Sequence, residues 1–287
     1  MSTLLRKRMR EDLNIRNYSI HTIDAYLRCV AHFAKYFGKS PELLGVEHIR
    51  EYQVFLVETM KATWSSLNQT VCALRFFYQV TLDRPDVIKH IPYARREKKL
   101  PVVLSLKEVR QFFRSIGSLK QRTIVMTMYG AGLRVSEATR LLVEDIDSPR
   151  MVIRVQQGKG RKDRYVPLSP TLLEQLRKYW KAYQPDFWLY PGQSKNLPIT
   201  RGAVQRAIAD ARRKAGMKKR VTCHTMRHCY ATHHLEAGTD LRSIQLWLGH
   251  RSLNSTAVYL HVAAEASQSN HEAVDLLRLD PDNHTEG

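Results

Sequence analysis

Apolar residues recur at the spacing of an α-helix through the N-terminal part of the chain. The stretch 20–37 is preceded by Ser19, a residue type that caps helix N-termini, and is followed by Gly38, which favours the left-handed conformation that ends helices. The stretches 46–59 and 65–80 repeat this helical spacing. In the first stretch the apolar or aromatic stripe consists of Ile23, Tyr26, Leu27, Val30, Phe33 and Phe37. We therefore expect a small all-helical domain over residues 1–83.

The helical pattern breaks down over residues 84–104. Three prolines interrupt this stretch, and proline disrupts regular secondary structure. The same stretch carries a run of basic side chains: Arg95, Arg96, Lys98 and Lys99. We expect a linker here, either an ordinary solvated one or one that lies along a phosphate backbone.

A second domain is expected over residues 105–287. Ser105 and Glu108 have the spacing of a helical capping box. The stretches 151–156 and 164–168 have the pattern of two short β-strands, and the loop between them is basic and contains glycine. Helical patterns cover 122–129, 170–183, 201–215, 224–237 and 241–248. The predicted fold is therefore mainly α with a small β-sheet, in which a helical N-terminal domain precedes a mixed α/β domain.

The charge of the chain indicates a polyanionic partner. Its 287 residues include 46 Lys and Arg against 27 Asp and Glu, a formal net charge of +19. Duplex DNA carries about one negative charge per 1.7 Å, although ribosomal and membrane-surface proteins share such a basic balance. No apolar run is long enough for a signal peptide or a membrane span, and the four cysteines lack disulfide-like spacing. We expect a cytoplasmic protein that contacts nucleic acid and no membrane.

Six residues of the second domain combine reactive side chains with local patterns that would expose them. Arg134 follows two glycines at a helix start, Lys159 lies in the hairpin loop, and His224 and Arg227 share a helix face. The full set is Arg134, Lys159, His224, Arg227, His250 and Tyr259. This set has the groups that phosphodiester transfer needs, and it has no clustered carboxylates to hold a metal.

Each of these groups has a candidate role if the six converge. The two arginines would bind non-bridging phosphoryl oxygens and stabilise the transition state, where losing one donor costs about 3–4 kcal/mol. Tyr259 would attack phosphorus, and His224 is the expected acceptor of its proton. Lys159 would protonate the leaving 5′ oxygen, and His250 would donate a hydrogen bond to the phosphate. Taken singly, Arg134 is more typical of a surface position at a helix start, Lys159 of a turn and Tyr259 of a half-buried core position.

Four segments strengthen this hypothesis because they resemble the boxes of a known family. GAGLRVSEATRL, QGKGRKDRYVPL, HTMRHCYATHHLEAGTDLRSIQLWLGH and STAVYLHV are similar, in order and separation, to the boxes of the tyrosine recombinase, or phage integrase, family. The likeness runs from about Pro101 to Val262. The N-terminal helices resemble the SAM-like core-binding domain of that family. Within the family the chain resembles Xer-like and transposon-borne site-specific recombinases.

The resemblance implies a mechanism and an assembly. The six residues above match the catalytic set, and Glu137 matches an acidic position that supports the first arginine. The resemblance implies cleavage and rejoining of double-stranded DNA through a 3′-phosphotyrosyl intermediate and a Holliday junction, without metal, ATP or another cofactor. It also implies a C-shaped clamp on DNA and a tetramer on the DNA.

Two other functions remain open at this point. A type IB-like topoisomerase would share the chemistry, and a non-catalytic DNA-binding protein would share the basic surfaces. A covalent protein–DNA adduct that disappears in Tyr259→Phe separates an enzyme from a non-catalytic binder.

The tract 223–234 is rich in cysteine and histidine, but its pattern argues against zinc because one helix would hold all the candidate ligands. We expect His228 to be a structural partner of the backbone or of the arginine region, and His233 and His234 to lie near a surface. Further DNA contacts are expected from the hairpin loop and from a basic helix: Arg161, Lys162, Arg201, Arg206, Arg212 and Arg213.

Overall fold

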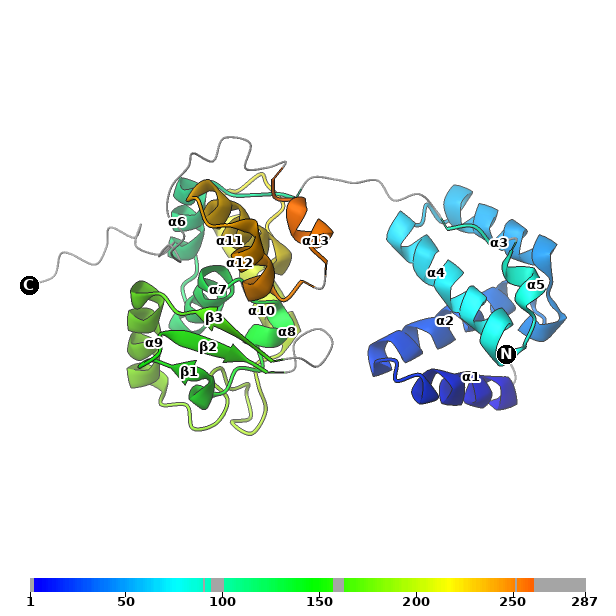
Figure 1. The fold of residues 1–287 in the computed structure, drawn as a ribbon, viewed down its shortest axis with the longest axis horizontal. Helices are drawn as coiled ribbons and strands as arrows, with labels where there is room; N and C mark the ends of the chain where they lie inside the picture. Colours follow the sequence, from blue (N-terminus) through cyan, green and yellow to red (C-terminus); the bar gives the residue numbers. More distant parts are fainter. Residues whose placement is uncertain (1–2, 90, 94–100, 157–162, 251, 261–287) are drawn as a thin grey trace, which may run out of the picture. The chain divides into compact units, whose positions relative to one another are not determined.

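The computed structural model describes residues 3–89, 91–93, 101–156, 163–250 and 252–260. The chain divides into two compact units, Met1–Lys99 and Leu100–Gly287, each with its own apolar core (Figure 1). In the described part of the chain, none of the helices combines the length and the apolar character needed to cross a bilayer. The mainly helical fold class with a small β-sheet is confirmed.

The first unit is all-helical. Its main helices are α1 (Thr3–Ile15), α2 (Ile20–Phe37), α3 (Val46–Glu58) and α4 (Trp64–Phe76), and its short ones are η1 (Pro41–Leu43), the π-helix η2 (Phe77–Thr81) and α5 (Pro85–Ile88). Helix α2 begins and ends as expected, because the Ser19 hydroxyl accepts from the Thr22 amide and Gly38 adopts a φ of 62°. Helix α1 was not expected, since only Met9 and Leu13 on it are buried and its remaining positions are mostly polar.

The end of the first unit differs from the linker expected over residues 84–104. Val87 and Ile91 are buried in the core of the first unit, whereas Leu104 is buried in the core of the second. The chain therefore belongs to the first core for several residues after position 83. The expected basic run (Arg95, Arg96, Lys98 and Lys99) lies outside the described residues.

The second unit combines helices with one antiparallel sheet in the order β1-β2-β3. Its strands are β1 (Ile146–Asp147), β2 (Val152–Val155) and β3 (Arg164–Pro167). Ile153 of β2 pairs with Ile146 of β1 and with Val166 of β3. Strands β2 and β3 match the expected hairpin, but the two residues of β1 are too few to show an alternating pattern.

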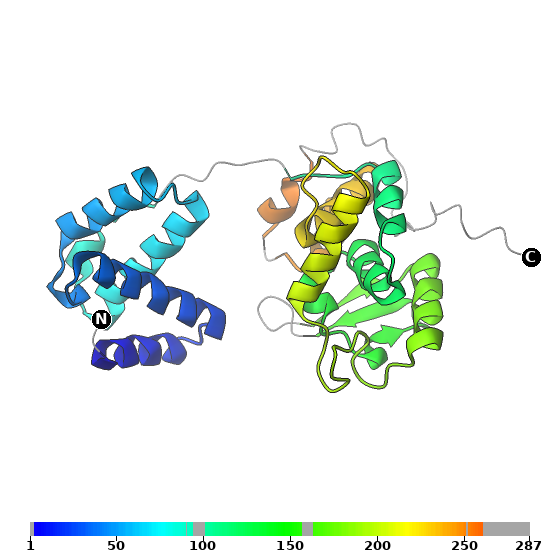
Figure 2. The same ribbon diagram turned by 180° about the vertical axis from the view of Figure 1, so that it is seen from behind.

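The helices of this unit are α6 (Leu106–Arg114), α7 (Leu119–Gly130), α8 (Val135–Ala138), η3 (Val143–Asp145), α9 (Pro170–Tyr183), α10 (Arg201–Lys214), α11 (Cys223–Glu236), α12 (Leu241–Leu248) and α13 (Asn254–Ala257). Helix α11 packs on α7, and α12 packs on β3 (Figure 1). The opposite view shows the yellow helix α10 running past α7 and α11 (Figure 2). Both α7 and α11 are buried on nearly all sides, so groups on them can be held away from water.

Candidate active site

Arg134 is positioned by a glycine turn between α7 and α8. Gly132 has a φ of 62°, and a Cβ atom there would lie 2.6 Å from the Tyr230 ring, so only glycine lets this turn approach α11. Arg134 then occupies the N-cap position of α8, where its backbone amide donates to Glu137 Oε2 over 2.8 Å. The local sequence thus places an arginine and a carboxylate side by side at a helix start.

Glu137 is shared by three arginines from different parts of the chain. Its Oε1 accepts from Arg134 Nη1 over 2.7 Å and from Arg164 Nη1 over 3.0 Å. Its Oε2 accepts from Arg164 Nη2 over 2.9 Å, which makes the Arg164 pair bidentate, and lies 3.8 Å from Arg227 Nη1. Only 6% of the Glu137 side chain is exposed. Three guanidinium groups around one carboxylate leave a surplus of positive charge, which favours an anionic ligand.

Arg227 reaches this cluster from α11 and is itself buried. Its Nη1 donates to the Gly132 carbonyl over 2.7 Å, and its Nη2 donates to the Leu248 carbonyl at the end of α12. Arg134 Nη1 also donates to the Leu248 carbonyl, over 3.5 Å. One guanidinium therefore ties together the glycine turn, α11 and α12.

The pKa values of the cluster follow from burial and charge. Burial alone would raise the pKa of Glu137, but the hydrogen bonds and charges of Arg164 and Arg134 lower it to about 2. Burial, together with the charges of Arg134 and Arg164, lowers the pKa of Arg227 to about 9. Glu137 is therefore ionised and Arg227 is charged at neutral pH, so the surplus positive charge persists there.

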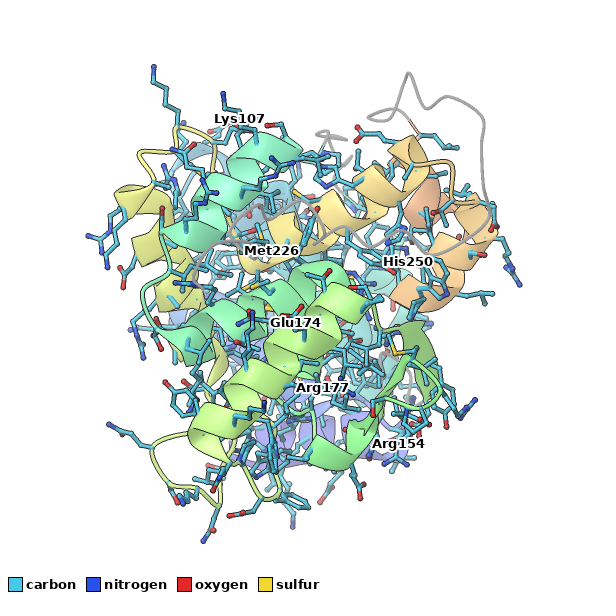
Figure 3. The ribbon with its side chains drawn as sticks, turned by 90° about the vertical axis from the view of Figure 1, so that its left-hand side faces the viewer. Lys107, Arg154, Glu174, Arg177, Met226 and His250 are labelled. Atoms are coloured by element: carbon cyan, nitrogen blue, oxygen red, sulfur yellow. The ribbon has the colours of Figure 1, made fainter. Side chains whose placement is uncertain are left out.

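His250 lies beside the arginines, directly after the C-cap of α12. Gly249 has a φ of 62°, and a Cβ atom there would lie 3.1 Å from the Arg164 side chain. The Nδ1 atom of His250 is 2.8 Å from the hydroxyl of Thr256, which belongs to α13. Burial and the charges of Arg227 and Arg134 lower the pKa of His250 to about 3, so the imidazole is neutral. Figure 3 shows His250 among the last helices, while Glu174 and Arg177 lie on α9.

Tyr259 follows α13 and is buried, with 2% of its surface exposed. Its hydroxyl is 3.0 Å from His228 Nδ1 on α11, and the two ring centroids are 5.6 Å apart. Burial raises the pKa of Tyr259, and the charges of Arg227 and Arg134 oppose this shift. The hydroxyl therefore lies in a polar, positively charged corner of an otherwise apolar core.

The structure brings five of the expected site residues into one region: Arg134, Glu137, Arg227, His250 and Tyr259. His224 is exposed on the first turn of α11, with its ring centroid 6.4 Å from that of His228. Lys159 lies outside the described residues, as do Arg161 and Lys162 of the same loop.

The basic helix expected over 201–215 forms as α10. Arg201, Arg206 and Arg213 are exposed on it, and Arg213 pairs with Asp210 of the same helix. Arg212 is partly buried and donates through Nε to the Met217 carbonyl over 3.3 Å. Their contacts with DNA stay a prediction.

Three residues of the site were not expected from the sequence: Arg164, His228 and Thr256. Arg164 belongs to the motif QGKGRKDRYVPL, but the basic residues of that motif are close together in sequence and their spacing does not indicate which one turns inward. His228 was expected to be a structural partner of the backbone or the arginines, and its hydrogen bond is instead to Tyr259. Its position one helical turn after His224 was the only available signal.

The other histidines of the tract correct an expectation. His233 and His234 were expected near a surface, but they are 4% and 2% exposed. His233 bonds the Tyr129 hydroxyl through Nδ1 and the Leu104 carbonyl through Nε2, each over 2.8 Å. Buried polar groups need such partners, and α7 and the segment before α6 supply them. Among the described residues, no group of three or more His, Cys, Asp or Glu side chains could hold a metal ion.

Comparison with known families gives two matches along this chain. Residues 103–266 match the phage integrase family, and residues 5–86 match the N-terminal SAM-like domain of phage integrases. Together the two matches cover most of the first unit and most of the second unit.

Individual relatives can be aligned with this chain over most of their length. A putative integrase/recombinase of Sinorhizobium fredii, y4qK, is 50% identical over 276 residues, which covers 96% of this chain and 90% of the relative. A tyrosine recombinase of Thermosipho africanus is 33% identical over 265 residues, with 87% and 92% covered. The fold is similar to that of a lambda integrase tetramer bound to a Holliday junction, with a TM-score of 0.75, 17% identity, and 89% and 76% covered.

Proposed function

Because the chain belongs to the phage integrase family and is a tyrosine recombinase, an enzyme that transfers DNA strands in site-specific recombination, we propose which of its residues carry out the transfer. The observation that carries the proposal is the convergence of groups from distant segments. Arg134, Arg227 and His250 surround one region, and the Tyr259 hydroxyl lies at its edge. The comparisons give no support to a topoisomerase or to a non-catalytic DNA-binding protein.

Arg134 and Arg227 bind the scissile phosphate in this proposal. Arg134 is hydrogen-bonded to Glu137, and Arg227 is hydrogen-bonded to backbone carbonyls, so the orientation of each side chain is set before the substrate binds. Preorganised donors of this kind stabilise the charge that develops on the phosphoryl oxygens, and no reorganisation is needed during the reaction. Arg164 anchors Glu137 through a bidentate pair, and its Nε donates to the Trp247 carbonyl over 2.7 Å.

His250 donates the third hydrogen bond to the phosphate. If the Thr256 hydroxyl donates to Nδ1, the proton of the neutral ring is on Nε2, where it is available to a phosphoryl oxygen. Tyr259 is the nucleophile and forms a 3′-phosphotyrosyl bond, while Lys159 protonates the leaving 5′ oxygen. Since Tyr259 is 2% exposed, its hydroxyl must become accessible when DNA binds.

The proposed substrate is double-stranded DNA, and the proposed assembly is a tetramer that acts through a Holliday junction. The net charge of +19 supports the first, and the likeness to the lambda integrase tetramer supports the second. We place this activity in the cytoplasm because the substrate is DNA. The assignment of the first unit as a SAM-like DNA-binding domain and of the second as the catalytic domain, and the C-shaped clamp, belong to the same proposal. The exposed arginines of α10 and the basic loop residues are proposed DNA contacts.

A suicide substrate tests the assignment of the nucleophile. Duplexes that bind the protein are first selected from a random-sequence pool, and a nick is then placed beside the cleavage position so that the short 5′-hydroxyl fragment is lost. We expect a protein–DNA adduct on a denaturing gel, attached to a 3′ end, unchanged by EDTA and absent in Tyr259→Phe. An adduct that persists in Tyr259→Phe, or one that needs a divalent metal, would falsify the proposal. Joining of two labelled duplexes then separates recombination from simple relaxation.

A further inference from the structure

We propose that His228, and not His224, accepts the proton of Tyr259 when the phenol attacks phosphorus. This inference rests on the strand-transfer function proposed above and concerns a residue to which that function assigns no role. The hydroxyl of Tyr259 lies 3.0 Å from His228 Nδ1, within the range for direct proton transfer.

The two histidines differ in position although they lie one turn apart on α11. His224 is on the first turn and its side chain is exposed, whereas His228 is partly buried against Tyr259. The ring centroids of His224 and His228 are 6.4 Å apart, and those of His228 and Tyr259 are 5.6 Å apart. Of the two rings, His228 is therefore the one that has a described hydrogen bond to the phenol.

The protonation state of His228 suits an acceptor. The groups that face it are His224 and Arg227 on α11, His250 after α12, and Tyr259 after α13. Burial and the charges of His224 and Arg227 lower the pKa of His228 to about 4, so the ring is neutral at pH 7. A phenol is a stronger acid than a neutral imidazole N–H, so the hydroxyl is the donor of this hydrogen bond and Nδ1 supplies the lone pair.

The proton and the bonds balance in the resulting step. Tyr259 Oη forms a bond to phosphorus while the bond from phosphorus to the 5′ oxygen breaks. The phenol proton moves to His228 Nδ1, which leaves an imidazolium, and the 5′ oxygen leaves as a hydroxyl with a proton from Lys159. The bound phosphate offsets the positive charges of Arg134 and Arg227, so the imidazolium costs less in the complex than in the free protein.

Replacing His228 by asparagine separates basicity from hydrogen bonding. The amide oxygen of the asparagine is attached to Cγ, as Nδ1 is in histidine, so it can accept from the phenol but cannot take up the proton. H224N is the matched control on the same helix. We expect H228N to form the adduct about 10²–10⁴-fold more slowly than wild type, the usual contribution of a general base. H224N should slow it by less than about tenfold.

Rates are measured in single turnover on the nicked duplex with saturating protein, so a change in affinity does not enter. H228Q replaces H228N if the asparagine variant does not fold. The wild-type rate should be flat between about pH 6.5 and 8.5, because the ring is neutral throughout this range. The H228N rate should rise about tenfold per pH unit, since the phenol must then ionise without a general base.

Three outcomes would overturn the inference. One is an unchanged rate of adduct formation in H228N. Another is a faster rate in H228N, which would mean that His228 restrains Tyr259. The third is a larger loss of rate in H224N than in H228N, with an altered pH dependence in H224N. Failure of the proposed function is a separate result. In that case wild type forms no adduct, or Tyr259→Phe still forms one, whatever residue stands at position 228.

Discussion

The two halves of the candidate active site are held in different ways. The phosphate-binding half, named for its proposed role, contains Arg134, Arg164 and Arg227 around Glu137, and their charge-assisted hydrogen bonds to Glu137 or to the Gly132 carbonyl measure 2.7–3.0 Å. The nucleophile half, named for the proposed role of Tyr259, has two described hydrogen bonds between side chains, His228 to Tyr259 at 3.0 Å and His250 to Thr256 at 2.8 Å, and Tyr259 also packs in the apolar core. Tyr259 directly follows the end of helix α13, which has four residues.

The phosphate-binding half is therefore held by charged groups, whereas the nucleophile half is held by neutral hydrogen bonds and apolar packing. Hydrogen bonds to charged groups contribute about 1.5–3 kcal/mol each, whereas neutral ones contribute about 0.5–1.5 kcal/mol. The arginine cluster also links β3, α8, α11 and the end of α12. Displacing Tyr259 breaks one described hydrogen bond between neutral side chains and its apolar packing, whereas displacing an arginine disturbs several segments at once.

The largest effect is expected from changing the two arginines that we propose bind the scissile phosphate. Arg227→Lys and Arg134→Lys keep the charge but lose the forked donors, so adduct formation should slow by about 10²–10³-fold. Arg177→Lys, on the exposed face of α9, is the matched control and should leave the rate unchanged (Figure 3). Single-turnover rates on the nicked duplex measure this. Equal rates for all three variants would show that the cluster does not bind the reacting phosphate.

Next in size is the loss of the shared carboxylate. Glu137→Gln leaves three guanidinium groups without a counter-charge, so the free energy of unfolding of the second unit should fall by about 3–5 kcal/mol. Tryptophan fluorescence in urea follows this unit in a Trp64→Phe background, because the remaining tryptophans, Trp180, Trp188 and Trp247, all lie in it. A decrease below about 1 kcal/mol would mean that the buried cluster contributes no more than a surface ion pair.

Acid should destabilise the same unit before Glu137 titrates. Burial lowers the pKa of His234 from 6.5 to about 4. Burying this ring in its neutral form therefore costs no free energy of unfolding above pH 6.5, and the free energy of unfolding falls as the pH decreases towards 4. For this residue alone the loss between pH 7 and pH 5 is about 2 kcal/mol. The contribution of Glu137 is lost later, between about pH 4.5 and 2. Urea melts at pH 7 and pH 5 test this, and His234→Phe should reduce the difference.

The smallest effect tests the nucleophile half. Thr256→Val removes the hydroxyl that bonds His250 Nδ1, so adduct formation should slow about fivefold to tenfold, the equivalent of about 1 kcal/mol. Thr256→Ser keeps the hydroxyl and should react at close to the wild-type rate. If valine and serine behave alike, His250 does not depend on this contact for its orientation.

Much of this molecule could be predicted from its sequence. Capping residues and apolar spacing predicted α2, α6, α9 and α12, and alternation predicted the β2–β3 hairpin, because these signals depend on neighbours along the chain. The motif segments identified Arg134, Arg227, His250 and Tyr259 together. The polar helix α1 and the two-residue strand β1 were not predicted, since neither carries a clear period.

Only the tertiary structure decided which side chains meet across space. His224 and His228 lie one turn apart on α11, and the sequence favoured the first, but the path of the chain after α13 brings Tyr259 to the second. In the same way the pairing of β2 with β3 turns Arg164 towards Glu137. Spacing along a helix or strand determines which residues lie on the same face. The partner of each residue depends on how that face packs against segments more than twenty residues away.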